Sequence, residues 1–326
     1  MRAKAARLLI LALSFLLLLV LLARLNPSAV LAALGHLGWL NFAMVLASGL
    51  VLTACLAAGL FALLAGEASV IRVFAARQLR DSAGDILPFT QIGGIALGTR
   101  VLVLGGMAPS RAIAAGVVDV TAELMAQSLF IFLGLWLAAP AIRADPHLGP
   151  HLGWLVAGTT LFAGGILVFA LLQLAGSDFA QRLLGQTSTG APAASFREAL
   201  HALYRRRARV ALSVLLHRMG WCASGIWLWV VFWALGQTVS PASAFAIQSL
   251  LEALRSAAVF IPAAIGVQEA GYAALAPLFG LSPAAGIAVS LVRRARDITI
   301  GVPVLLIWQW SEARRLRRLS PAKPPL

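Results

Sequence analysis

The chain has 326 residues, of which 60% are hydrophobic and 12% are charged, and its formal net charge is +14. A soluble domain is nearer roughly 45–50% apolar, so this composition excludes an ordinary soluble enzyme and indicates a polytopic membrane protein. The cations lie between or inside apolar stretches and form no basic–aromatic module, which argues against nucleic acid and for anionic lipid headgroups at the cytoplasmic face.

Long apolar stretches recur along the chain and predict an all-α, polytopic transmembrane helical bundle with about eight spans. The first stretch, Leu8 to Ala23, follows a basic N-terminus and resembles a signal peptide. No convincing cleavage site follows it, so we expect a retained helix within an N-terminal anchor at 1–38. The other predicted spans are 39–64, 111–139, 152–174, 210–235, 242–261, 262–280 and 283–310.

These spans form a single integral membrane domain over residues 1–326. The sequence divides into a first half at 39–174, a polar linker at 175–209, a second half at 210–310 and a basic tail at 311–326. Basic residues gather at the N-terminus, at 66–85, in the linker and in the tail. The positive-inside rule therefore places the linker, the polar segment 66–85 and both termini in the cytoplasm.

The stretch 86–107 is only moderately apolar and carries Pro88, Gly93, Gly94 and Arg100. A lipid-facing span would not hold so many helix breakers and an arginine, so we predict a re-entrant hairpin or a pair of half-helices. A hairpin would also keep all the basic regions on one side of the membrane. The alternative is a tightly packed helix that uses its glycines for close approach.

A second interrupted stretch runs from Phe260 to Tyr272 and contains Pro262, Gly266 and Glu269. A membrane-buried carboxylate beside a broken helix usually marks a functional site. Both interrupted stretches place a proline four or five residues before a glycine. This weak echo is compatible with a two-repeat architecture, in which broken helices meet near the midplane.

Charged side chains inside the predicted spans are the candidate site. Each costs at least ~2.5 kcal/mol at a helix centre unless it is paired or hydrated, so we expect them to face a shared polar interior. The candidate substrate-binding or translocation residues are Arg100, Asp119, Glu123, Glu252, Arg255, Pro262, Gly266, Glu269, Arg293, Arg296 and Asp297. The alternative is a set of buried ion pairs that only lock helices together.

No catalytic or metal-binding pattern is visible in the sequence. The two cysteines lie in apolar stretches without disulfide, zinc or haem spacing. The five histidines lie mostly in predicted loops or near span ends, where we expect them at the membrane interface. We therefore expect no catalytic residue, no metal and no cofactor.

The pattern Pro262-x-x-x-Gly266-x-x-Glu269 resembles the transmembrane, flippase-like domain of the lysylphosphatidylglycerol synthase family. The pair Gly93-Gly94 followed by Arg100, and Glu123 in the next span, add to this likeness, which covers about residues 35–310. Within the family, the chain resembles the members associated with hopanoid biosynthesis. The resemblance implies a multi-pass protein of the bacterial inner membrane that handles hopanoid or phospholipid-type lipids.

Three functions are compatible with these features, and a lipid transporter or flippase is favoured. Some family members carry a soluble aminoacyl-transferase domain, but the longest soluble stretch here, 176–209, is too short for a catalytic domain. The first alternative is an intramembrane enzyme that modifies lipids, with Asp119 and Glu123 as its acids. The second is a non-catalytic partner that recruits lipid biosynthesis enzymes through its basic linker and tail.

Overall fold

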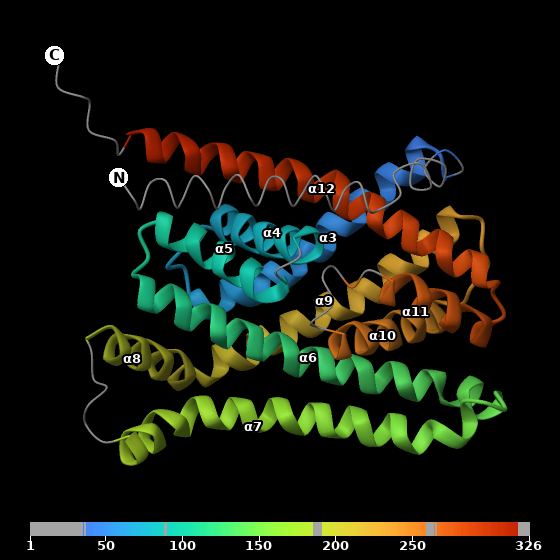
Figure 1. Cartoon of the computed structure of the whole chain (residues 1–326), viewed down its shortest axis with the longest axis horizontal. Coiled ribbons are helices and arrows are strands. Elements are labelled where there is room, and N and C mark those ends of the chain that lie inside the picture. Colours follow the sequence, from blue (N-terminus) through green and yellow to red (C-terminus); the bar gives the residue numbers. More distant parts are fainter. Residues whose placement is uncertain are drawn as a thin grey trace.

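The computed structural model describes residues 35, 37–87, 90–184, 191–258, 264 and 266–318, and these residues are helical apart from short turns (Figure 1). No strand occurs within these ranges, which confirms the all-α fold. The predicted N-terminal span, 8–23, and the end of the basic tail lie outside the described residues. The α-helices are α3 (Trp39–Leu64), α4 (Val70–Ile86), α5 (Thr90–Leu104), α6 (Pro109–Ala144), α7 (Leu152–Leu184), α8 (Ala191–Arg205), α9 (Arg207–Ala234), α10 (Pro241–Ala257), α11 (Val267–Leu275) and α12 (Pro283–Arg318), and the 3₁₀ turns are η1 (Gly149–His151) and η4 (Ala276–Phe279).

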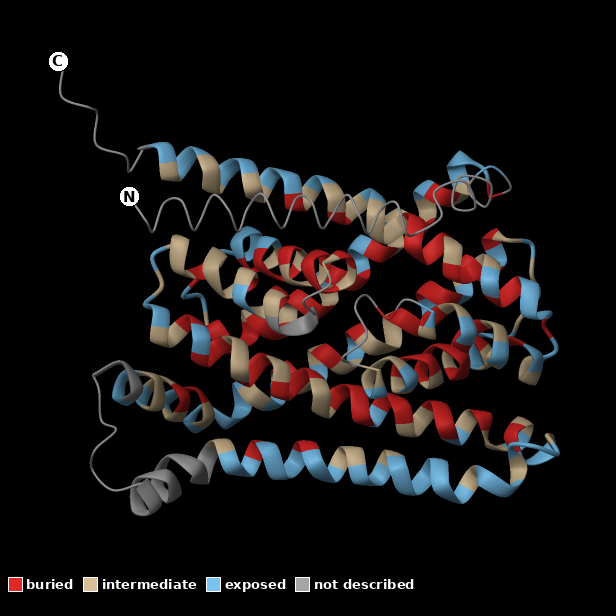
Figure 2. Cartoon of the chain, viewed as in Figure 1, coloured by how far each residue is buried: buried red, intermediate tan, exposed pale blue. Residues whose placement is uncertain are grey.

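Four of the described helices are long and apolar enough to cross a membrane, namely those at Trp39–Leu64, Pro109–Ala144, Gly149–Gln173 and Arg207–Ala234. They coincide with four of the predicted spans. Helix α12 is also long, at 36 residues, but several arginines interrupt its first half. Over residues 152–173, helix α7 is mostly exposed, whereas buried residues concentrate in the other helices of the bundle (Figure 2). We infer that α7 lies against lipid.

The helices follow the same order in the two halves of the chain. A long helix, two short helices and a second long helix occur as α3–α4–α5–α6 and again as α9–α10–α11–α12. Helix α3 packs against α9, α4 packs against α12, and α10 packs against α6. Helices α6 and α12 run in opposite directions across the bundle (Figure 1). This is the arrangement expected of an inverted two-repeat architecture.

In the first half, α4 and α5 pack together as a helical hairpin. The 17 residues of α4 rise about 25 Å at 1.5 Å per residue, less than the ~30 Å of a hydrocarbon core. Where the sequence predicted a polar cytoplasmic segment at 66–85, the structure contains the helix α4, which buries Val73, Ala76, Leu79 and Ala83 in the bundle. Its apolar positions recur every three or four residues, so one face of the helix is covered.

The stretch predicted as a self-contained hairpin, 86–107, forms one helix, α5, and the partner of that helix is α4. Glycines bring the two backbones together. A Cβ atom on Gly94 would collide with the carbonyl oxygen of Arg80, and one on Gly98 would lie 2.9 Å from the carbonyl oxygen of Ala76. The glycines of α5 therefore serve close helix approach, as the alternative interpretation expected.

In the second half, α10 and α11 are two separate helices. Helix α10 ends at Ala257 and α11 begins at Val267, after Gly266 with a φ of 82°. A φ in this range favours glycine, because a Cβ atom would be strained there. The carboxylate of Glu269 accepts a hydrogen bond of 2.8 Å from the Gly266 N–H and so caps α11. Pro262 lies outside the described residues.

Candidate functional site

A cavity of about 440 Å³ lies in the bundle, and side chains of both halves line it. Helices α4 and α6 of the first half and α10 and α12 of the second half supply its charged residues. They are Arg77, Arg80, Asp81, Asp85, Glu123, Glu252, Arg255, Arg293 and Arg296. Charges at such density in a membrane protein are stable only when they pair with one another or meet water.

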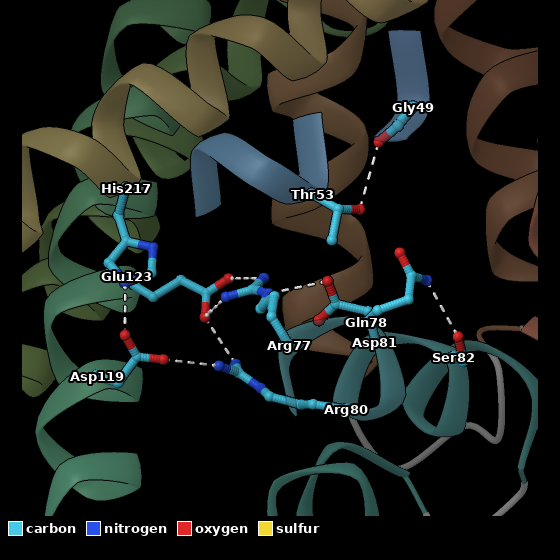
Figure 3. A network of polar contacts seen from close by, with 10 residues as sticks. All are labelled: Gly49, Thr53, Arg77, Gln78, Arg80, Asp81, Ser82, Asp119, Glu123 and His217. Carbon is cyan, nitrogen blue, oxygen red and sulfur yellow. Dashed lines mark hydrogen bonds and ion pairs between the residues drawn. The ribbon is translucent and has the colours of Figure 1, made fainter. Parts of the chain in front are cut away.

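The first half contributes a connected cluster of ion pairs between α4 and α6 (Figure 3). Arg77 donates to both carboxylate oxygens of Glu123, at 2.6 and 2.9 Å, and its Nε donates to Asp81 at 2.8 Å. Arg80 bridges Glu123, at 2.6 Å, and Asp119, at 3.1 Å. The Arg77 side chain is only 4% exposed, and its two-pronged contact with Glu123 is the strongest geometry available to this pair.

The second half contributes a cluster between α10, α11 and α12. Arg293 donates to Glu252 at 3.0 Å and to the Tyr272 hydroxyl at 3.2 Å. That hydroxyl donates to Gln248 at 3.0 Å, and the amide of Gln248 donates to Glu252 at 3.1 Å. This closed ring of hydrogen bonds fixes the Glu252 carboxylate on one wall of the cavity.

One ion pair joins the two halves across the cavity. Arg255 of α10 donates to Asp85 of α4 at 3.0 Å and also donates to Gln268 of α11 at 2.8 Å. Asp85 and Arg255 each lie in the last turn of their helix. The short helices of the two repeats therefore meet through their C-terminal ends.

Some donors near the cavity have no acceptor among the described residues. They include the buried Nε atoms of Arg80 and Arg293 and the indole Nε1 of Trp221. Each of these three residues also lines the cavity. Buried N–H groups normally find an acceptor, so an oxyanion or a water molecule would satisfy them here.

The structure brings five of the predicted site residues to the cavity wall, namely Glu123, Glu252, Arg255, Arg293 and Arg296. Asp119 lies behind Arg80, and Asp297 pairs with Arg296 at 3.3 Å. Glu269 pairs with Arg294 at 3.0 Å beside its cap on Gly266.

Arg100 is not among the described residues that line the cavity. It donates to Glu312 of α12 at 2.8 Å, and its side chain is 41% exposed. This contact joins α5 to α12. Pro262 lies outside the described residues, so its position is not assigned.

Four charged residues of α4 were not among the predicted site residues, because their segment was predicted to be polar and cytoplasmic. They are Arg77, Arg80, Asp81 and Asp85. Their spacing, with steps of three, one and four residues, places all four on one side of a helix. That pattern was the available signal. His217 was expected at the membrane interface, and this is wrong, because its ring is fully buried and lies 2.9 Å from Asp119.

Outside the membrane-spanning helices, a smaller ionic cluster holds the loop between α3 and α4. Glu67 accepts hydrogen bonds from Arg111 at 2.7 and 2.8 Å and from Arg206 at 3.3 Å. The hydrogen bond from Arg111 is the largest cause that lowers the pKa of Glu67 below its ordinary value. The cluster therefore ties this loop to α6 and to the start of α9.

Long apolar helices around a cavity of paired charges define a helical membrane protein with a polar interior. The family model described as the lysylphosphatidylglycerol synthase TM region matches residues 6–306, so the chain belongs to this family. This confirms the resemblance at the level of the family and supports a membrane-embedded, lipid-related protein. Neither the search of curated proteins nor the search of solved structures found a match.

Proposed function

We propose that this protein moves membrane lipids between the leaflets of the bilayer, with the lipid headgroup in the central cavity. The observation that carries the proposal is a cavity of about 440 Å³ that five arginines and four carboxylates line. Ligand pockets commonly measure about 300–1,000 Å³, so this volume suits a headgroup while the tails remain in the bilayer.

The balance of charge supports a headgroup that carries both signs. Guanidinium groups supply donors for a phosphate or carboxylate, and several of their N–H groups lack an acceptor among the described residues. Glu252, Asp81 and Asp85 line the same cavity and supply acceptors for an ammonium or hydroxyl group. A zwitterionic or polyhydroxylated headgroup could therefore find both donors and acceptors in the cavity.

We further propose a hopanoid or phospholipid-type substrate and a location in the bacterial inner membrane, with both termini in the cytoplasm. The substrate proposal rests on the resemblance of the chain to the hopanoid-associated family members alone. The orientation rests on the arginines of the linker and of the tail, which the positive-inside rule assigns to the cytoplasm.

Lipid movement is a better account than intramembrane catalysis. Both carboxylate oxygens of Asp119 are engaged, one by Arg80 and one by His217. Both oxygens of Glu123 are engaged by arginines. Carboxylates held in this way are poor general acids or bases, because guanidinium groups and, at Asp119, the His217 imidazole already occupy their oxygens. We therefore propose that the chain is not an enzyme.

The test is a leaflet assay with purified protein in vesicles. Fluorescent zwitterionic phospholipid, and in parallel a hopanoid with a polar side chain, would be followed as it moves between leaflets. We expect wild-type protein to accelerate movement over protein-free vesicles. Loss of a charged contact costs about 1.5–3 kcal/mol, so Glu252→Gln should slow movement roughly tenfold or more.

The matched control is Arg100→Gln, since Arg100 pairs with Glu312 and is not among the described cavity residues. We expect this variant to retain the wild-type rate. A wild-type rate equal to that of protein-free vesicles would contradict the proposal. A chemically altered lipid in the same vesicles would instead support the enzyme alternative.

A further inference from the structure

A buried histidine ends the ionic chain that leaves the cavity (Figure 3). His217 of α9 is fully buried, and its Nε2 lies 2.9 Å from Oδ1 of Asp119. The other oxygen of Asp119 accepts from Arg80, which lines the cavity. Contacts thus run without a break from the cavity wall to the imidazole, through Asp81, Arg77, Glu123, Arg80, Asp119 and His217.

The charges in this series of ion pairs do not balance when the His217 imidazole is neutral. Among the described residues, three carboxylates, those of Asp81, Asp119 and Glu123, face two guanidinium groups, those of Arg77 and Arg80. One proton on His217 would neutralise the remaining negative charge. A protonated imidazole would therefore complete the charge pairing of this cluster.

The ion pairs around Arg255 and Arg293, which include Asp85 of α4, offer a contrast. Four guanidinium groups and four carboxylates pair there within the part of the chain that the structure describes, and they need no further proton. They are Arg255, Arg293, Arg294 and Arg296 with Asp85, Glu252, Glu269 and Asp297.

Around the imidazole, the structure leaves one position for a proton. Nδ1 of His217 is buried and has no hydrogen-bond partner among the described residues, and the same holds for Oγ of Ser213, one turn earlier on α9. On the α3 side the ring lies against Gly59, where a Cβ atom would come within 2.5 Å of Nε2. Asp119 is the charged group in contact with the ring, Arg80 and Glu123 stand behind it, and Arg218 follows His217 on α9.

We propose that His217 and Asp119 form a proton-binding site that controls how firmly Arg80 is held away from a headgroup. A proton from water adds to Nδ1, and no covalent bond breaks. The resulting imidazolium becomes a cationic partner of Asp119, which weakens the hold of Asp119 on Arg80. Arg80 can then bind the oxyanion of a headgroup in the cavity, and the proton returns to water when the headgroup leaves.

This linkage rests on the proposed function, and it has a definite sign. Because protonation frees Arg80 for an oxyanion, a lower pH strengthens headgroup binding, and headgroup binding strengthens proton binding equally. A gradient of protons across the membrane would then bias the direction in which lipid moves. Histidine suits this role, since its charge changes between about pH 5 and pH 8 in ordinary surroundings.

The proton site can be tested without any transport. The full chain in lipid nanodiscs, with ¹⁵N-labelled histidine, would be followed by NMR from about pH 5 to pH 9. The His217 signal is assigned by its loss in His217→Gln, or by exclusion with glutamine variants of the other four histidines if that variant does not fold. We expect the His217 signal to change protonation state in this range, and its titration to shift in Asp119→Asn. A ring that keeps one protonation state throughout would overturn the proposal.

The coupling is tested separately by the pH profile of lipid movement. We expect wild-type protein and the control His151→Gln, whose histidine is exposed beside α7, to move lipid faster as pH falls. His217→Gln should give a flat profile, and a profile equal to that of wild type would refute the coupling. Vesicles in which wild-type protein moves no lipid would refute the proposed function, while the NMR titration would still decide the proton site.

Discussion

Replacing Glu123 with glutamine tests whether the cluster between α4 and α6 stabilises the bundle. The carboxylate of Glu123 receives donors from Arg77 at 2.6 and 2.9 Å and from Arg80 at 2.6 Å. The side chain of Arg77 is 4% exposed, that of Glu123 is 8% exposed and that of Arg80 is 13% exposed. The substitution leaves two buried guanidinium groups without their shared counter-charge, and breaking a buried pair costs about 3–5 kcal/mol.

The assay is reversible unfolding of the purified protein in mixed micelles, which yields the change in the free energy of unfolding. The matched control is Glu312→Gln, which makes the same chemical change at an ion pair whose arginine, Arg100, is 41% exposed. Glu312 is 16% exposed, so this pair is more open to solvent than the Glu123 cluster, and the control should lose less stability. Equal losses in the two variants would refute the reasoning that burial makes the Glu123 cluster costly to break.

Three further outcomes are expected. Gly94→Ala should lower the free energy of unfolding by about 1–3 kcal/mol, because the new Cβ would collide with the Arg80 carbonyl. The control Gly158→Ala, which has open space around it on α7, should change this free energy by less than about 1 kcal/mol. Similar values for the two variants would contradict the packing of α4 on α5. A double-mutant cycle of Asp85→Asn and Arg255→Gln should give a coupling of about 0.5–3 kcal/mol, whereas additive losses would show that the 3.0 Å contact does not join the halves. A reporter that is active only in the cytoplasm should be active when it is fused to the C-terminus. Activity of a reporter that works only in the periplasm would overturn the predicted orientation.

The class of fold and part of the site follow from local patterns. Apolar length predicts the helices at 39–64 and 210–235, and the structure contains α3 and α9 there. The shared helical face of Glu252 and Arg255 is also a local property, and both side chains line the cavity. Such residues are predictable because their neighbours in sequence already place them on one side of a helix.

The charges of α4 show where local reasoning failed. A segment with three arginines fits a polar cytoplasmic segment, and its packing against α5 and α12, together with its ion pairs to α6, makes it a helix of the bundle. Arg77 is 46 residues from Glu123 in sequence, so the contact between them depends on tertiary packing. His217 is similar, since its burial depends on Gly59 of α3 and Asp119 of α6.

Arg100 shows the opposite error. Its place after two glycines in a moderately apolar stretch made it a candidate for the interior. The structure instead pairs it with Glu312 near the far end of α12, 212 residues later. A sequence pattern can indicate that a charge needs a partner, but it does not identify which distant partner the fold supplies.

The central claim is that lipid headgroups pass through the cavity, and filling the cavity tests it most directly. Ser256 lines the cavity and accepts a hydrogen bond of 3.2 Å from Gln127, so Ser256→Trp would occupy that space. Thr160→Trp adds the same side chain at an exposed position on α7 and is the control. In the leaflet assay, we predict that Ser256→Trp abolishes lipid movement while Thr160→Trp retains the wild-type rate. Equal rates for the two variants would contradict the account.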